Sequence, residues 1–205
     1  MENFDIAGLQ ARDVTTNFIM AINGAFFVSR KVGLKPTPHD IELGKINVQT
    51  ASYLFSNNLK SLINIYDSGD ETQVTQVKLN SITVQLIKKA NLAITTGIAN
   101  GAATMLGNNA HGSLGQLVAR ASQTLNLSVV DSAGRTWKDP SALVQTIVRD
   151  YHYQHEVDER INQLKEQGQT SFAVGGHIYQ LDNLPNLRSQ LFHPNANNLP
   201  EQIHV

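Results

Sequence analysis

Two long segments of the chain begin with a capping residue followed by proline, and both continue with apolar residues every three or four positions. In the first, Thr37 is expected at the N-cap, Pro38 at the first helical position and Asp40 at the third. In the second, the pair Asp139-Pro140 opens a helix in the same way. Their apolar stripes are Val48, Ala51, Phe55, Leu59, Leu62 and Tyr66 in the first, and Leu143, Ile147, Tyr151, Val157, Ile161 and Leu164 in the second. Because such helices are stable only when these stripes pack together, the pattern predicts a mainly α fold.

Further helices are expected on either side of the first of these. Residues 6–33 form one, since four apolar residues four positions apart share a face: Val14, Phe18, Ile22 and Phe26. Residues 72–106 are ambiguous, because 72–87 is rich in β-branched residues and could form a hairpin that turns at Asn80. The helix is favoured, since no glycine or proline interrupts the run before Gly97.

Short β segments are predicted in the second half of the chain. Residues 127–130 and 135–137 can pair across a turn, and 170–180 has the form of a hairpin. Gly175 and Gly176 at its centre supply the positive φ that a two-residue turn requires. The expected fold class is therefore a mainly α helical bundle with a small antiparallel β element.

The chain divides into three parts on this interpretation. Residues 1–126 form a helical domain that includes a loop over 107–112 and a short helix over 113–123. Residues 127–180 form a unit of strand, long helix and β-hairpin. Residues 181–205 form an extended C-terminal arm, because their spaced single hydrophobic residues and prolines cannot make a core of their own.

Composition excludes several classes of function. The chain has no cysteine, which rules out a disulfide scaffold, a cysteine-ligated zinc site and a cysteine nucleophile. Its 16 basic and 17 acidic residues lack the basic excess of a nucleic-acid-binding protein. Asparagine and glutamine make up about one residue in six, while only 16% of residues are charged, well below the usual share. A surface of this kind suits a protein whose faces are covered by partners.

Neither a secretory leader nor a membrane span is predicted. The first residues are acidic and mixed in character, with no basic start and no unbroken apolar run. Residues 91–119 carry no charge, but polar residues divide them into apolar runs far shorter than a spanning helix needs.

The strongest candidate for catalysis is a group of side chains on the second long helix. His155 and Glu159 stand four positions apart and His152 three positions earlier, a spacing that could place ligands on one metal ion. A solvated helical face explains the same residues, and we favour it. The sequence has no nucleophile elbow and no phosphate-binding loop. We therefore expect no catalytic, metal or cofactor site.

The segment from Val129 to Arg149 resembles the strand–turn–helix segment of minor head proteins of tailed bacteriophages, which lie near the portal. Asp131, Gly134, Arg135 and Trp137 take the places of that family's Asp, Gly-Arg and Trp, and Arg149 takes that of an arginine on the following helix. The Asp139-Pro140 pair lengthens the spacing from Trp to Arg, and the family's downstream segment with His and Cys has no counterpart. A plain β-turn with Trp137 packed under the helix remains an alternative.

The resemblance implies a non-enzymatic structural protein of the virion: a minor head protein, a head–tail connection component or an internal protein released with the genome. Its partners would be other virion proteins or copies of itself in a homo-oligomer, with incidental proximity to DNA through Arg135 or Lys138. The alternatives are an intracellular interaction module, such as a bacterial effector or adaptor, and more remotely a metal-assisted hydrolase that uses the histidines.

The C-terminal arm is the expected partner-binding element. We expect it to lie on a neighbouring subunit or another partner, with Phe192 and Leu199 as anchors, although packing along its own domain is the alternative. The apolar residues that would make the contact are Leu184, Leu187, Leu191, Phe192, Leu199 and Ile203.

Overall fold

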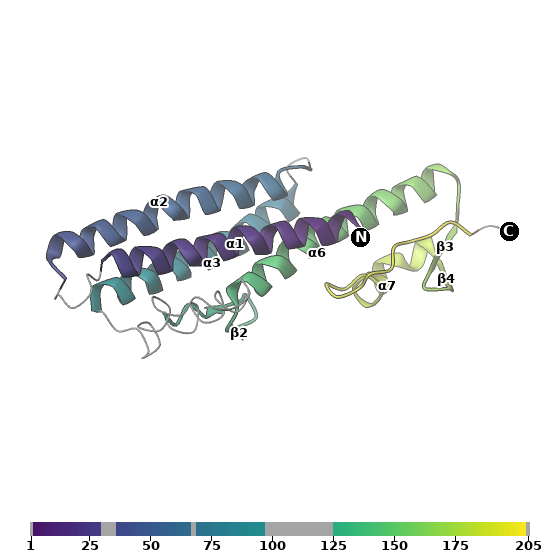
Figure 1. Cartoon of the computed structure of the whole chain (residues 1–205). Helices are drawn as coiled ribbons and strands as arrows, with labels where there is room; N and C mark the ends of the chain where they lie inside the picture. The colour runs from purple at the N-terminus through teal and green to yellow at the C-terminus, as the bar shows by residue number, and fades with distance from the viewer. Residues whose placement is uncertain (1, 30–35, 67–68, 97–124, 204–205) are drawn as a thin grey trace.

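The computed structural model describes residues 2–29, 36–66, 69–96 and 125–203. Its long helices are α1 (Asn3–Val28), α2 (Pro38–Ile63), α3 (Asp70–Thr96) and α6 (Pro140–Glu166), which lie along one another (Figure 1). The shorter elements are the strands β1 (Val129–Val130), β2 (Thr136–Trp137), β3 (Ser171–Val174) and β4 (His177–Gln180), the 3-10 turn η1 (Leu181–Asn183) and the helix α7 (Leu184–Leu191). Both strand pairs are antiparallel. The predicted mainly α bundle with a small antiparallel β element is confirmed.

The predicted helix starts are present in atomic detail. The backbone N–H of Asp40 donates to Thr37 Oγ1 at 3.2 Å, and the N–H of Thr37 donates to Asp40 Oδ2 at 3.0 Å, so the two residues form a capping box. At the start of α6, the N–H of Ser141 donates to Asp139 Oδ1 at 2.9 Å. Both caps use side chains within three residues of the helix start, which is why local sequence was sufficient to find them.

Residues 72–87 lie in α3, so the hairpin alternative for this stretch is wrong. Packing explains the outcome, because Leu79, Ile82 and Leu86 are buried among the other helices. The hydroxyl of Thr83 donates to the carbonyl of Leu79, one turn earlier, which satisfies a buried polar group within the helix. The predicted loop at 107–112 and short helix at 113–123 lie outside the described residues.

A first core joins α1, α2 and α3 to the first half of α6. The Phe18 and Phe55 rings stack at its centre with their centroids 4.5 Å apart. Gly44 allows α2 to approach α1 closely, since a Cβ there would lie 2.9 Å from Ser29 Cβ and 3.2 Å from the Ala25 carbonyl oxygen. Any side chain at position 44 would therefore push the two helices apart.

A second core lies on the second half of α6. Tyr153 and Phe4, the latter near the start of α1, meet edge to face with their ring centroids 5.1 Å apart. The other buried members are Val157, Ile161, Leu164, Phe172, Val174, Leu184 and Phe192. The two cores divide between Tyr151 and Tyr153, inside α6. The predicted boundary after residue 126 is therefore not where the packing separates, because α6 belongs to both cores.

The C-terminal arm packs on its own chain. It begins with η1 and α7, turns back beside α6, and reaches the free edge of β3, where Ala173 and Glu201 exchange backbone hydrogen bonds of 3.0 and 2.9 Å (Figure 1). The hydroxyl of Tyr153 donates to the Asn198 carbonyl at 2.8 Å, and the Gln154 amide donates to the Phe192 carbonyl at 2.7 Å. The expectation of an extended arm on a neighbouring subunit is thus corrected for Leu184 and Phe192, which are buried within this chain.

The physical reason is the length of α6. Val157, Ile161 and Leu164 continue its apolar stripe beyond Phe4, where the bundle helices no longer cover it. The hairpin β3–β4 and the arm cover this part of the stripe, so the arm buries apolar side chains of its own chain.

We expect Phe192→Ala to lower the free energy of unfolding by about 3–4 kcal/mol, because it empties a large buried aromatic site. Urea denaturation measures the change. Leu187→Ala is the matched control in the same arm, since Leu187 is only half-buried and is expected to cost below about 1 kcal/mol. Equal small effects of both substitutions would contradict the packing of the arm on α6.

Candidate interaction cleft

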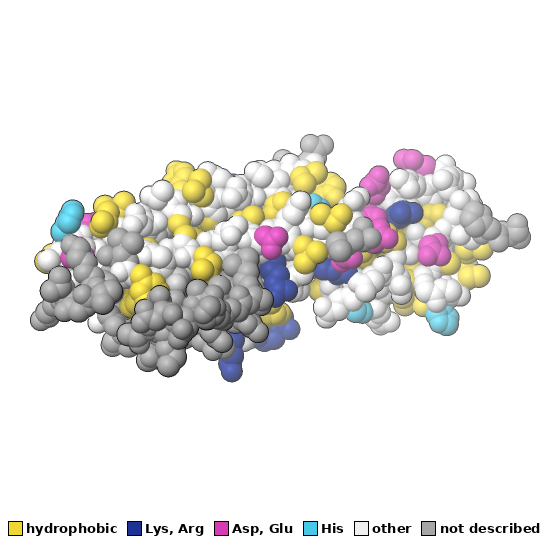
Figure 2. Space-filling model, in the orientation of Figure 1, with side chains coloured by type: hydrophobic (Ala, Val, Ile, Leu, Met, Phe, Trp, Pro, Cys, Tyr) yellow, Lys and Arg dark blue, Asp and Glu magenta, His cyan; other side chains and the backbone are white. Residues whose placement is uncertain are grey.

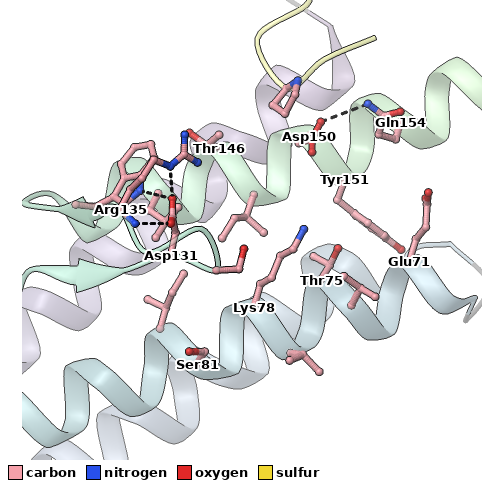
Figure 3. A pocket seen from close by; sticks show the side chains of 18 of the residues that line it. Glu71, Thr75, Lys78, Ser81, Asp131, Arg135, Thr146, Asp150, Tyr151 and Gln154 are labelled. Carbon is pink, nitrogen blue, oxygen red and sulfur yellow. Dashed lines mark hydrogen bonds and ion pairs between the residues drawn. The ribbon is translucent and has the colours of Figure 1, made fainter. Parts of the chain in front are cut away.

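A cleft of about 570 Å³ opens between α3, the β1–β2 turn and the first half of α6 (Figure 3). We call it the α3–α6 cleft. Its apolar lining includes Val74, Val77, Ile82, Val130, Leu143 and Ile147. Val77 and Val74 are 67% and 54% exposed, so much of this lining is open to solvent. The volume and mixed lining are typical of a binding cleft.

The turn from Asp131 to Trp137 forms one wall of the cleft, and Asp131 holds it together. Its carboxylate accepts from the backbone N–H groups of Ala133 and Arg135, both at 2.9 Å, from Arg135 Nε at 2.8 Å and from Trp137 Nε1 at 2.9 Å. The hydrogen bond from Trp137 is the largest cause that lowers the pKa of Asp131 to about 2, and the donors at Arg135 and Ala133 add to it. Gly134 has a φ of +79°, which allows the chain to reverse here.

The residues of the phage resemblance divide into two groups in the structure. Asp131, Gly134, Arg135 and Trp137 form the turn just described, and half-buried Trp137 packs against the first core. Arg149 lies elsewhere: its Nε donates to Asp5 at 2.8 Å, and its terminal nitrogens donate to the carbonyls of Pro194 and Ala196 at 2.9 and 3.2 Å. Arg149 therefore ties the C-terminal arm to α1 and takes no part in the turn.

Helix α3 fixes the position of β1 beside the cleft. Gln85 Oε1 accepts from the N–H of Val130 at 2.8 Å, and Gln85 Nε2 donates to the Val130 carbonyl at 3.0 Å. Lys89 Nζ donates to the Ser128 carbonyl at 2.5 Å, and burial lowers the pKa of this lysine. The amide thus occupies the outer edge of β1 as a neighbouring strand would. No sequence signal singled out Gln85.

The opposite wall carries a half-buried carboxylate. Burial raises the pKa of Asp150, and its hydrogen bond from Gln154 is long, at 3.4 Å. Lys78 extends from α3 into the space between α3 and α6 (Figure 3). Tyr151, the next residue of α6 after Asp150, is held in place by two contacts. Its hydroxyl donates to the Ile63 carbonyl at 2.8 Å and lies 2.7 Å from Thr72 Oγ1.

The histidines considered for a metal site serve the packing of α6 against the end of α2. His152 Nε2 lies 2.7 Å from the Leu62 carbonyl and its Nδ1 lies 3.3 Å from the Tyr66 hydroxyl, so both ring nitrogens have partners in the protein. Burial lowers the pKa of His152, which favours the neutral ring. His155 stacks on Tyr66 at 4.2 Å between centroids, whereas Glu159 is exposed. Within the described ranges, no three His, Cys, Asp or Glu side chains are grouped to hold a metal ion.

An apolar face on α2 points away from the first core. We call it the α2 outer face, and it consists of Leu43, Ile46, Thr50, Tyr53 and Leu54. Tyr53 and Leu54 are 69% and 64% exposed, and Ile46 is 52% exposed. Figure 2 shows apolar side chains at the surface along α2, among side chains that are mostly uncharged. The sequence contained a usable signal, because residues 43, 46, 50 and 53 follow a spacing of three and four.

The predicted partner-binding residues of the arm offer no comparable surface. Leu184 and Phe192 are buried, and the other four are only partly exposed: Leu187, Leu191, Leu199 and Ile203. Of the helices that the structure describes, none is long and apolar enough to cross a membrane.

Comparison of the chain with protein-family models, with curated proteins and with solved structures found no match.

The hydrogen bonds to Asp131 predict how stability depends on pH. Because folding lowers the pKa of Asp131 to about 2 from its ordinary 3.8, its contribution is complete above about pH 4 and is lost as the pH falls toward 2. Asp131→Asn should therefore lower the urea midpoint at pH 7, and the difference from wild type should shrink at pH 2.5. Asp13→Asn, at an exposed position of α1, is the control for removing a charge. A difference for Asp131→Asn that is the same at both pH values would contradict this role of the carboxylate.

Proposed function

We propose that the chain is a non-enzymatic assembly protein of a tailed-bacteriophage virion, as a minor head protein, a head–tail connection component or an internal protein. The observation that carries the proposal is the α2 outer face. Helix α2 buries one apolar stripe in the bundle and exposes a second one on its opposite side. A helix with two apolar faces is expected where a partner covers the second face.

The charges around this face support contact with another protein. Along α2 from Glu42 to Ile63 the charged residues are Glu42, Lys45 and Lys60. So little charge gives weak repulsion between molecules and a low desolvation cost when the face is covered. The whole chain has the same character, with 16% charged residues and a net charge of −1.

The virion setting is favoured by the segment from Val129 to Arg149. Its strand, turn and following helix occur in the order that the resemblance to minor head proteins implies. An intracellular effector or adaptor could use the same apolar face, so the location of the protein is the property that separates these two proposals. The hydrolase alternative has no comparable support, because the two ring nitrogens of His152 already contact the Leu62 carbonyl and the Tyr66 hydroxyl.

The test is whether the protein is built into particles. Virus particles are purified in a density gradient from host cells infected with a phage that carries the gene. They are then probed with an antibody against the recombinant protein. We expect the protein to co-sediment with the particles at a constant ratio to the major capsid protein, and to remain bound in high salt. Its presence in the soluble fraction alone would refute the virion proposal and favour an adaptor.

Substitution of the α2 outer face makes this test specific. The double variant Tyr53→Glu/Leu54→Glu should fold, since both side chains are exposed, but its incorporation into particles should fall by about tenfold or more. The double variant Gln10→Glu/Asn17→Glu adds the same charge at exposed positions of α1 and should be incorporated normally. Equal incorporation of the two variants would show that the α2 outer face is not the contact.

A further inference from the structure

Among the residues that the structure describes are a projecting apolar surface and a recessed one, and neither is covered by another described part of the chain. The projecting surface is the α2 outer face, and the recessed one is the α3–α6 cleft. We infer that the cleft of one copy of the chain takes the α2 outer face of a second copy. This inference rests on the proposed function insofar as it uses the same face of α2 and names its partner.

The spacing of side chains on the two surfaces is compatible. Leu43, Ile46, Thr50 and Tyr53 follow one another at intervals of three, four and three residues along α2. On the α3 wall of the cleft, Val74, Val77 and Ser81 follow at intervals of three and four. Helices that pack side by side in a shallow crossing bring together such stripes, and an amphipathic helix in a groove presents its anchors with the same spacing.

The charges of the two surfaces are complementary. Asp131 and Arg135 are paired with each other in the cleft wall. Among the described residues that line the cleft, this leaves Asp70, Glu71 and Asp150 against Lys78. Asp150 is half-buried and accepts a long hydrogen bond from the Gln154 amide, and the charges of Lys78 and Arg149 act on it as well. The part of α2 that would enter carries Lys45 and Lys60 together with Glu42, a net positive charge opposite in sign to that of the cleft.

The two surfaces lie on different parts of the bundle. Helix α2 packs on α1 and α3, whereas the cleft opens between α3 and α6. A copy that inserts its α2 outer face into a neighbour therefore keeps its own cleft free for a third copy. Such head-to-tail contacts produce a ring when the rotation closes and a filament when it does not.

A complementation experiment tests this arrangement with the full chain. The face variant is Tyr53→Glu/Leu54→Glu, and the cleft variant is Val74→Glu/Val77→Glu; all four side chains are exposed, so the fold should be retained. Circular dichroism and thermal melting check that it is. Sedimentation velocity and light scattering then measure the mass of wild type, of each variant and of an equimolar mixture of the two.

We expect wild type to grow in mass with concentration and each variant alone to stay monomeric. The mixture should form a one-to-one dimer and stop there, because only the cleft of the face variant and the α2 of the cleft variant remain intact. The dissociation constant of that dimer should rise about tenfold or more when the cleft partner also carries Asp150→Lys, which places a cation against the incoming lysines.

Each other outcome overturns the inference. A cleft variant that still dimerises alone would indicate a symmetric contact between two α2 outer faces. A mixture that stays monomeric, or a wild type that is monomeric at every concentration, would show that the cleft does not take a second copy. In that case, co-sedimentation with particles would leave the proposed function standing with another virion protein as the partner, whereas self-association without co-sedimentation would sustain the inference and refute the proposed function.

Discussion

The apolar stripe of α6 is longer than the bundle that covers it, and the rest of the structure follows from this mismatch. Leu143, Val144 and Val148 enter the first core beside α1, α2 and α3. Val157, Ile161 and Leu164 lie on the part of α6 that extends past the N-terminal end of α1. Leaving those three side chains in water would expose a continuous apolar strip. The hairpin β3–β4 and the C-terminal arm cover it, and Arg149 joins that cover to the N-terminus through Asp5. The bundle and its appendage are therefore one structure built on a single helix.

The parts of the fold that depend on local interactions could be predicted from the sequence. The caps at Thr37 and Asp139 act within three residues of a helix start, and the Gly175-Gly176 turn requires only its own backbone freedom. Propensity could not tell whether residues 72–87 are a helix or a strand, because Thr72, Thr75 and Thr83 suit a strand. Burial against the other helices stabilises the helix α3 instead. The packing of the arm could not be predicted for a similar reason. The sequence indicates that the apolar side chain of Phe192 must be buried against some surface. It does not indicate that the second half of α6 has an apolar stripe that the bundle helices leave exposed.

The candidate surfaces were harder to predict than the fold. The buried stripe of α2 was found through Val48, Phe55 and Leu59, and once that face was assigned, Leu43, Ile46 and Tyr53 had no role in the bundle. Their regular spacing is visible in the sequence, whereas the cleft exists only because β1 is held against α3 by Gln85. A concave surface made by elements far apart in the chain depends on tertiary structure, and no local pattern encodes it.

The second core joins segments far apart in the chain, since Phe4 meets Tyr153 and both belong to one cluster with Phe192. During synthesis this core cannot close until the C-terminal arm has left the ribosome. The helices that precede α6 can meet earlier, because their contacts join residues made before it. The distal half of α6 and the first turn of α1 must wait with their apolar side chains in water, at the stage when a nascent chain is most exposed to aggregation and to chaperones. Emergence of the C-terminal arm is thus also the event that buries the first turn of α1.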